Sequence, residues 1–327
     1  MKAIFLDHPC SVEEMRISEI PVPEVRPGWV LVKIQAIGLN HSEALLRMFE
    51  IENDYIRKPI VPGIECAGVV ADAMEESRFS EGDWVIAMMG GMGRSFNGSY
   101  AEYALLPEQN VFWVNTTDRT EPWDWISLAA VPETYFTAYG SLTECLLLND
   151  NDTLLVRGAT STVGQAAIQL GKAMDANVIA ACRKEKDFDR LKAIGADVCV
   201  LDDGHLAESL PSEMRPNKVL ELVGPATLQD SLRCVKKPGY VCNTGILGNV
   251  FTVEHFDPIK YIPNGVFLTG FFCNFPTQEI IDSMFELINR KHIKPLYSKV
   301  FRLDEIAEAH KLLEQGGAGG KIVLKLP

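Results

Sequence analysis

Hydrophobic and polar positions follow two different patterns along this chain of 327 residues. Up to about residue 118 the apolar residues come in short runs, such as 30–36 and 83–87, which Pro and Gly interrupt. From about residue 152 short apolar runs alternate with stretches in which apolar residues recur every three or four positions. The first pattern is typical of strands in a partly closed β-barrel, and the second of βαβ units around a parallel sheet.

The clearest βαβ unit begins at residue 153. Residues 153–157 predict a strand and 158–162 a turn, and one apolar face indicates the helix that follows: Val163, Ala167, Leu170 and Met174. Further strands are predicted at 177–182, 198–201, 219–223 and 240–244, with a helix at 188–194. Together they predict most of a doubly wound sheet of the α/β class.

The last part of the chain, beyond about residue 256, has a pattern of its own. It contains an apolar run at 266–272, amphipathic helices at 278–290 and 303–314, and a closing strand at 321–325. The pattern predicts these elements but does not place them in either domain.

Composition excludes several classes of function. The 44 acidic and 31 basic side chains give a formal net charge of −13, which repels a polyanion, so nucleic acid is not an expected partner. No apolar run approaches the roughly 20 residues that cross a bilayer, and the opening MKAIFLDHPC has no long apolar stretch after a basic head, so we expect a soluble protein without a membrane partner. Eight scattered cysteines without a CxxC pair favour a reduced, cytoplasmic location.

A turn rich in small residues, GATSTVG at 158–164, lies between the first predicted strand and its helix. The first amides of a helix lack internal partners and its N-terminus carries partial positive charge, so such a turn suits a pyrophosphate. Ser161 and Thr162 stand where glycine is usual in such turns, and their hydroxyls are candidates to bond phosphate. We predict a dinucleotide site, with an ordinary βα turn as the alternative. The predicted contacts are Gly158, Thr160, Ser161, Thr162, Val163 and Gly164.

The residues after the second strand of this unit select the cofactor. An NAD enzyme places Asp or Glu about 20 residues beyond the turn, against the 2′-hydroxyl of the ribose. Here the strand ends at Cys182 and is followed by Arg183, Lys184 and Lys186, which suit a 2′-phosphate. The sequence therefore favours NADPH. The alternative is a solvated basic helix start, in which carboxylates such as Glu185 balance these cations.

Several blocks of sequence occur in an order that is typical of a known family: AIGLNHSEALLR, VPGIECAGVV, EGDWVIA, NGSYAEY, VPETYFTAYGSL, GATSTVGQAAIQLGKA and FRLDEIAEAHKLLEQGGAGGKIVL. In these blocks the chain resembles the zinc-free branch of the medium-chain dehydrogenases/reductases, which holds quinone oxidoreductase and zeta-crystallin. The resemblance implies a GroES-like, partly closed β-barrel catalytic domain at 1–120, completed by about 260–327. It further implies a Rossmann-type NADPH-binding domain at 121–259 and a homodimer, which we expect to pair through the run at 266–272.

The same resemblance identifies metal ligands that the chain lacks. Zinc alcohol dehydrogenases of this superfamily carry Cys, His and Cys where this chain has Asn40, Ile64 and Glu133. Glu65 remains, but one carboxylate does not supply the nitrogen and sulfur ligands that zinc prefers. The four-cysteine lobe that holds a structural zinc is replaced by the loop MMGGMGRSFNGSY. We therefore expect no metal site, and a zinc enzyme that uses Glu65 and Glu133 is the alternative.

The resemblance also implies residues near the reacting groups. Asn40 matches the family's active-site asparagine and is expected to donate to a substrate oxygen or to the nicotinamide ribose, with a turn-capping role as the alternative. Thr137 matches a threonine that contacts the nicotinamide, and Gly245 and Ile246 match a second contact on that side. The alternatives for these three residues are packing and an ordinary βα turn.

Two further residues are candidates for catalysis. Tyr135 is placed in sequence to donate a hydrogen bond or a proton to a developing enolate, and Glu133 to bind a polar substrate. A place in the core or on a helix surface is the alternative for each. Some family members carry tyrosine where this chain has Leu45, so the proton is expected to come from elsewhere or from water.

These expectations combine into one hypothesis about function. Without a Lewis acid, hydride transfer works best on acceptors that delocalise the incoming charge, such as quinones and α,β-unsaturated carbonyls. We therefore expect an NADPH-dependent, zinc-independent oxidoreductase that acts on small molecules of this kind. Two alternatives stay open: a non-catalytic NADPH-binding sensor or structural protein, and a zinc-dependent alcohol dehydrogenase.

Overall fold

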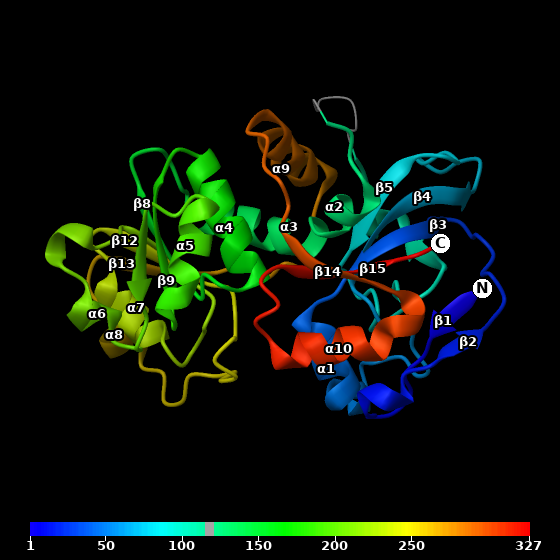
Figure 1. Ribbon diagram of the computed structural model, residues 1–327, viewed down its shortest axis with the longest axis horizontal. Coiled ribbons are helices and arrows are strands. Elements are labelled where there is room, and N and C mark those ends of the chain that lie inside the picture. Colours follow the sequence, from blue (N-terminus) through cyan, green and yellow to red (C-terminus); the bar gives the residue numbers. More distant parts are fainter. Residues whose placement is uncertain (115–120) are drawn as a thin grey trace. The chain divides into compact units, whose positions relative to one another are not determined.

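The computed structural model describes residues 1–114 and 121–327, and the chain divides into two compact units (Figure 1). Unit 1 comprises Met1–Phe136 and Asn274–Pro327, and unit 2 comprises Thr137–Cys273. Both junctions lie further along the chain than the expected 120 and 260. The reason is packing: α2 (Trp125–Ala129) lies against strands of unit 1, and β13 (Val266–Gly270) pairs with a strand of unit 2.

Unit 1 is built on a seven-stranded, mostly antiparallel sheet with the order β14-β15-β3-β4-β5-β7, in which β6 also pairs with β3. A separate antiparallel pair is formed by β1 and β2. The strands are β1 (Lys2–Ile4), β2 (Ile17–Glu19), β3 (Trp29–Gly38), β4 (Glu65–Ala73), β5 (Trp84–Met88), β6 (Tyr103–Pro107), β7 (Val111–Trp113), β14 (Tyr297–Arg302) and β15 (Lys321–Lys325). The helices are α1 (His41–Met48), α2, α9 (Gln278–Arg290) and α10 (Ile306–Gln315), and α3 (Pro132–Gly140) contains the junction with unit 2.

The strand that positions the candidate site of unit 1 is β3. Its β-branched residues suit a pleated strand, and Val30, Val32 and Ile34 are buried in the main core of the unit. It pairs antiparallel with β4, β6 and β15. Just beyond its end, the amide of Leu39 donates to the carbonyl of Ile322 at 2.9 Å. The N-terminal and C-terminal parts of the chain therefore meet at the point where β3 leads into α1.

Unit 2 contains a six-stranded sheet with the order β10-β9-β8-β11-β12-β13, in which all neighbours are parallel. The strands are β8 (Thr153–Arg157), β9 (Asn177–Cys182), β10 (Val198–Leu201), β11 (Lys218–Glu221), β12 (Gly239–Asn243) and β13. The helices are α4 (Thr162–Ala173), α5 (Phe188–Ala193), α6 (Leu206–Ser209), α7 (Leu228–Cys234) and α8 (Pro258–Tyr261). Chain order reverses between β8 and β11, and doubly wound sheets bind ligands beyond the carboxyl ends of the strands at such a reversal.

The sequence pattern located most of these elements. The predicted strands at 153–157, 177–182, 198–201 and 321–325 coincide with β8, β9, β10 and β15, and the predicted helix at 278–290 coincides with α9. Strands β11 and β12 each begin one residue before the predicted start. The expected α/β class with a doubly wound parallel sheet is confirmed. No helix within residues 1–114 and 121–327 combines the length and the apolar character needed to cross a bilayer.

Candidate functional site

The turn between β8 and α4 has the geometry of a nucleotide-binding turn. Gly158 leaves the strand with φ of 85°, a conformation that favours glycine. Ser161 is the N-cap of α4: its hydroxyl accepts from the Gly164 amide at 3.0 Å and donates to the Gly158 carbonyl at 2.8 Å. This hydroxyl uses its one proton inside the turn, and its expected bond to phosphate stays a prediction.

Other donors of the turn remain available to a ligand. Within the described part of the chain, the amides of Thr162 and Val163 have no acceptor, because they lie in the first turn of α4. The hydroxyls of Thr160 and Thr162 are likewise without a protein partner among these residues. The side chains of Thr160, Thr162 and Val163 are half-buried. Free amides at the positive end of a helix of 12 residues fit a pyrophosphate.

Gly164 brings α4 close to the turn. A Cβ atom at this position would lie 2.5 Å from the carbonyl oxygen of Gly158 and 2.9 Å from Cα of Ala159. Both atoms belong to the backbone, so the helix would have to move away. Gly164 thus allows the first turn of α4 to lie against the backbone that directly follows β8.

A Gly164→Ala variant is expected to bind NADPH about tenfold more weakly or worse and to lose about 1–3 kcal/mol of the free energy of unfolding. Titration calorimetry and urea unfolding measure the two effects. Gly171→Ala in the same helix is the matched control, because the added Cβ there meets the flexible end of the Leu154 side chain at 2.9 Å rather than backbone. Equal NADPH affinity in the two variants would contradict this role of Gly164.

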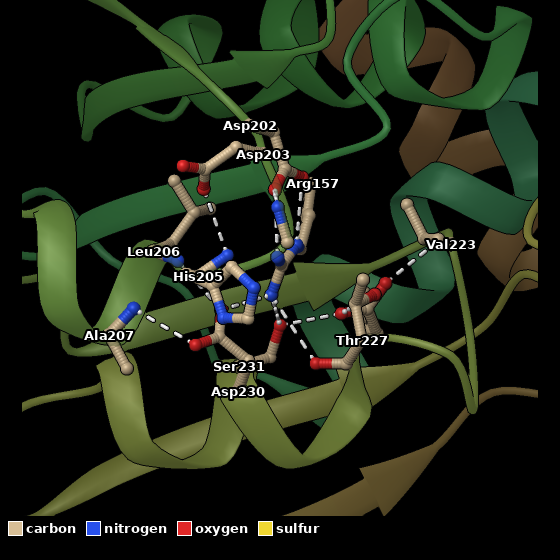
Figure 2. Close-up of polar contacts among 12 residues, drawn as sticks. Arg157, Asp202, Asp203, His205, Leu206, Ala207, Val223, Thr227, Asp230 and Ser231 are labelled. Carbon is tan, nitrogen blue, oxygen red and sulfur yellow. Dashed lines mark hydrogen bonds and ion pairs between the residues drawn. The ribbon is translucent and has the colours of Figure 1, made fainter.

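The cations predicted to recognise a 2′-phosphate follow β9. Arg183 and Lys184 are exposed, and within residues 1–114 and 121–327 neither side chain forms an ion pair or a hydrogen bond. The nearby carboxylate of Asp187 pairs instead with Arg190 at 3.3 Å. The carboxylate that follows the next strand, Asp202, accepts two hydrogen bonds from buried Arg157 (Figure 2). Two cations without a partner among the described residues therefore follow β9, at the positions from which we predict recognition of a 2′-phosphate.

The residues predicted to contact the nicotinamide are connected within unit 2. The carbonyl of Thr137 accepts from the Ser141 hydroxyl at 2.7 Å, and this hydroxyl lies 2.9 Å from that of Thr244. Gly245 follows directly, and a Cβ there would lie 2.2 Å from the Leu222 carbonyl oxygen. The next residue, Ile246, is exposed. Sequence reasoning missed Ser141, whose place at the start of a π-helical turn gives no signal in the sequence pattern.

In unit 1 the side chain of Asn40 joins a buried polar cluster. Its Nδ2 donates to Glu65 Oε1 at 2.8 Å, and its Oδ1 accepts from the ammonium of Lys321. Glu43 holds the backbone beside it, because its carboxylate accepts from the amides of Asn40 at 2.7 Å and Ile64 at 3.1 Å. Burial raises the pKa of Glu43 to about 7. Asn40 itself is half-buried.

Lys321, the first residue of β15, is the centre of this cluster and is 1% exposed. Its ammonium donates to Glu65 at 2.6 Å, to the Thr134 hydroxyl at 2.9 Å and to Asn40, so all three protons are used. Glu133 Oε2 lies 3.7 Å away. Burial opposes the charge, but Glu65 and Glu133 raise the pKa of Lys321 above its ordinary value. The two carboxylates therefore favour the charged form of Lys321.

The donor set around this lysine does not fit zinc. The ammonium lies between Glu65 and Glu133, the two carboxylates that a zinc site would have to use. In the part of the chain that the structure describes, no group of three or more His, Cys, Asp or Glu residues is arranged to hold a metal ion. Zinc prefers four ligands that include nitrogen or sulfur. Sequence reasoning missed Lys321, although a lysine at the start of an apolar closing strand was a visible signal.

The other two catalytic candidates, Glu133 and Tyr135, have different surroundings. The amide of Glu133 donates to Glu65 Oε2 at 2.7 Å, and its side chain is 14% exposed. Tyr135 is only 2% exposed, and burial raises the pKa of its phenol, which lies by the backbone of Leu296. This burial favours the packing role for Tyr135 over proton donation to a substrate.

Comparison with known proteins agrees with this architecture. Residues 26–116 match the model of the alcohol dehydrogenase GroES-like domain, and residues 194–324 match that of the zinc-binding dehydrogenases. Human quinone oxidoreductase is 27% identical, with 94% of this chain and 92% of the human protein aligned. A chloroplastic quinone-oxidoreductase, QR1 of Triphysaria versicolor, is also 27% identical over the same shares. The solved structure of the quinone oxidoreductase from Coxiella burnetii superposes with a TM-score of 0.83 at 25% identity and covers 100% of this chain and 99% of that one. The chain thus belongs to the medium-chain dehydrogenase/reductase family and is similar over almost its whole length to quinone oxidoreductases.

Proposed function

We propose that this protein transfers hydride from NADPH to quinones or α,β-unsaturated carbonyls and that it does so without zinc. The family assignment makes it an oxidoreductase with a nicotinamide cofactor, and the choice of NADPH and of acceptor is our inference. The observation that carries the proposal is the buried ammonium of Lys321, which lies where Asn40, Glu65 and Glu133 would otherwise face a metal ion.

The residues present divide the task between binding and donation. Bound NADPH supplies the hydride. The amides of Thr162 and Val163 would hold its pyrophosphate, and Arg183 and Lys184 its 2′-phosphate. Asn40 would donate a hydrogen bond to the acceptor oxygen as that oxygen gains negative charge. One neutral donor stabilises much less charge than a metal ion, which favours acceptors that spread the charge over a conjugated system.

The test is turnover under metal-free conditions. Purified protein in the presence of a chelator is expected to oxidise NADPH with 1,4-benzoquinone, 1,2-naphthoquinone or 2-cyclohexenone, measured as loss of absorbance at the nicotinamide wavelength. NADH is expected to be a poorer donor. Tight NADPH binding without turnover of any acceptor would instead support a binding protein, and activity that disappears with the chelator and returns with zinc would support the zinc enzyme.

We also propose a homodimer in a reducing compartment. Strand β13 is at the edge of the parallel sheet, and Phe267 on it is 50% exposed. An apolar edge strand of this kind invites pairing with another copy. None of the eight cysteines, all of which the structure describes, forms a disulfide, which accords with a reducing environment. Elution as a monomer in gel filtration at micromolar concentration would refute the dimer.

A further inference from the structure

The side-chain amide of Asn40 has a single orientation that is consistent with its neighbours. An asparagine amide offers two N–H donors and one oxygen acceptor. Lys321 is only a donor, so it requires the oxygen, and Glu65 as a carboxylate is only an acceptor, so it requires the nitrogen. These contacts use the oxygen and one of the two amide protons. One N–H of the half-buried side chain is left for a ligand.

We propose that Lys321 and Glu65 act together as positioning residues for Asn40, and that they orient and polarise its amide so that the remaining N–H is a stronger donor. The proposal rests on the proposed function, because the acceptor of this N–H is the substrate oxygen that becomes negative during hydride transfer. An ammonium on the amide oxygen withdraws electron density from the nitrogen. Hydrogen bonds in such chains strengthen one another in a medium of low dielectric.

The cost of the ion pair supports a role beyond stability. Replacement of a buried ion pair by apolar residues is often neutral or stabilising, so the buried pair of Lys321 and Glu65 is weak evidence for a purely stabilising role. The chain also makes room for the pair. At Gly38, the last residue of β3, a Cβ atom would lie 2.6 Å from Glu65 Oε1 and 2.7 Å from Lys321 Cε.

The backbone of Asn40 is held as firmly as its side chain. Glu43 accepts from the amide of Asn40 at 2.7 Å, and the amide of Glu43 donates back to the carbonyl of Asn40 at 3.1 Å. Neither contact depends on Lys321 or Glu65. Loss of the ion pair should therefore free the Asn40 amide group to rotate while the loop itself keeps its conformation.

The decisive variant is Lys321→Met combined with Glu65→Gln, which removes both charges of the buried pair and leaves the Glu133 carboxylate, whose side chain is 14% exposed, without the Lys321 cation. We expect kcat with a quinone to fall about 10- to 100-fold. This loss should not exceed the loss of about 100- to 1000-fold that follows complete removal of a catalytic hydrogen-bond donor. The KM for NADPH should change less than twofold. Lys325→Met on the same strand, where the side chain is exposed, is the matched control and should leave kcat unchanged.

The Asn40→Ala background separates positioning from a general effect. If the pair acts through Asn40, the double substitution should lower kcat less than threefold once Asn40 is absent, because there is no amide left to orient. The proposal would be overturned if the loss of kcat in the triple variant equalled the product of the losses in Asn40→Ala and in the double variant. It would also be overturned if the double variant kept the kcat of the wild-type protein.

A measurement without turnover distinguishes failure of this inference from failure of the proposed function. In protein labelled with ¹⁵N-asparagine, the side-chain signals absent from Asn40→Ala identify the Asn40 amide. In the double variant these signals are expected to shift and broaden, as the amide becomes free to rotate. If they stay in place the positioning role is wrong even in an active enzyme, whereas a wild-type protein without any turnover would refute only the proposed reaction.

Discussion

Replacement of Arg157 by methionine is expected to lower the free energy of unfolding by about 3–5 kcal/mol, the cost of leaving buried charges without their partner. The guanidinium, on the last residue of β8, is fully buried. It donates to both oxygens of Asp202 at 2.8 Å and to Asp230 at 2.7 Å (Figure 2). Methionine has a similar volume, so the loss comes from the charge rather than from a cavity.

The network around Arg157 joins five segments of unit 2. Asp230 on α7 also accepts from the amides of Leu206 and Ala207 at the start of α6, at 2.9 and 3.1 Å. The hydroxyl of Ser231 lies 3.0 Å from the guanidinium and donates to Glu221 at 2.5 Å. The loss of Arg157 therefore affects β8, β11, α6, α7 and the residue that follows β10 together (Figure 2).

An exposed arginine provides a matched control for this prediction. Arg302 forms the same two-pronged contact with Asp304, at 2.9 and 3.0 Å, but its side chain is 69% exposed. Arg302→Met should leave the urea midpoint unchanged, since water replaces the lost contact. Equal midpoints for Arg157→Met and Arg302→Met would show that burial of the network does not matter.

The second large effect is expected on the choice of cofactor. In Arg183→Ser/Lys184→Ser, affinity for NADPH should fall about 100-fold, since each charge-assisted hydrogen bond contributes about 1.5–3 kcal/mol. Affinity for NADH, which has no 2′-phosphate, should change less than threefold. Both side chains are exposed and have no partner among the described residues, so their removal should leave stability unaffected.

Titration of each variant with both cofactors measures this change. Lys192→Ser, a substitution of another exposed lysine in unit 2, controls for the loss of positive charge alone and should keep the preference for NADPH. A preference for NADH in the wild-type protein, or an equal loss of affinity for both cofactors in the double variant, would remove the basis for assigning the 2′-phosphate to Arg183 and Lys184.

Local features of the chain could be predicted well because they depend on neighbours in sequence. The turn from β8 to α4 is encoded by Gly158, Ser161 and Gly164 within seven residues, and the structure places it at the predicted strand and helix. The cations after β9 were found in the same way. The direction of the Ser161 O–H could not be predicted, because it is set by the Gly158 carbonyl that accepts from it.

Contacts between distant segments escaped prediction. Lys321 and Asn40 are 281 residues apart, and only the pairing of β15 with β3 brings them together. The observed junctions between the two units differ from the predicted ones for a similar reason. Helix α2 packs against strands of unit 1 and β13 pairs with a strand of unit 2, and neither contact is visible in the local sequence. Burial of Tyr135 likewise follows from packing and not from its neighbours in sequence.

The sequence by itself determined the periodic strands and helices, the parallel sheet with its small-residue turn, and the two cations after β9, since each depends on side chains a few positions apart. Only the tertiary structure decided that an ammonium lies between Glu65 and Glu133 and that Arg157 joins two aspartates from different segments. The physical reason is that a buried charge is stable only beside its partners, and those partners come from parts of the chain that meet only on folding.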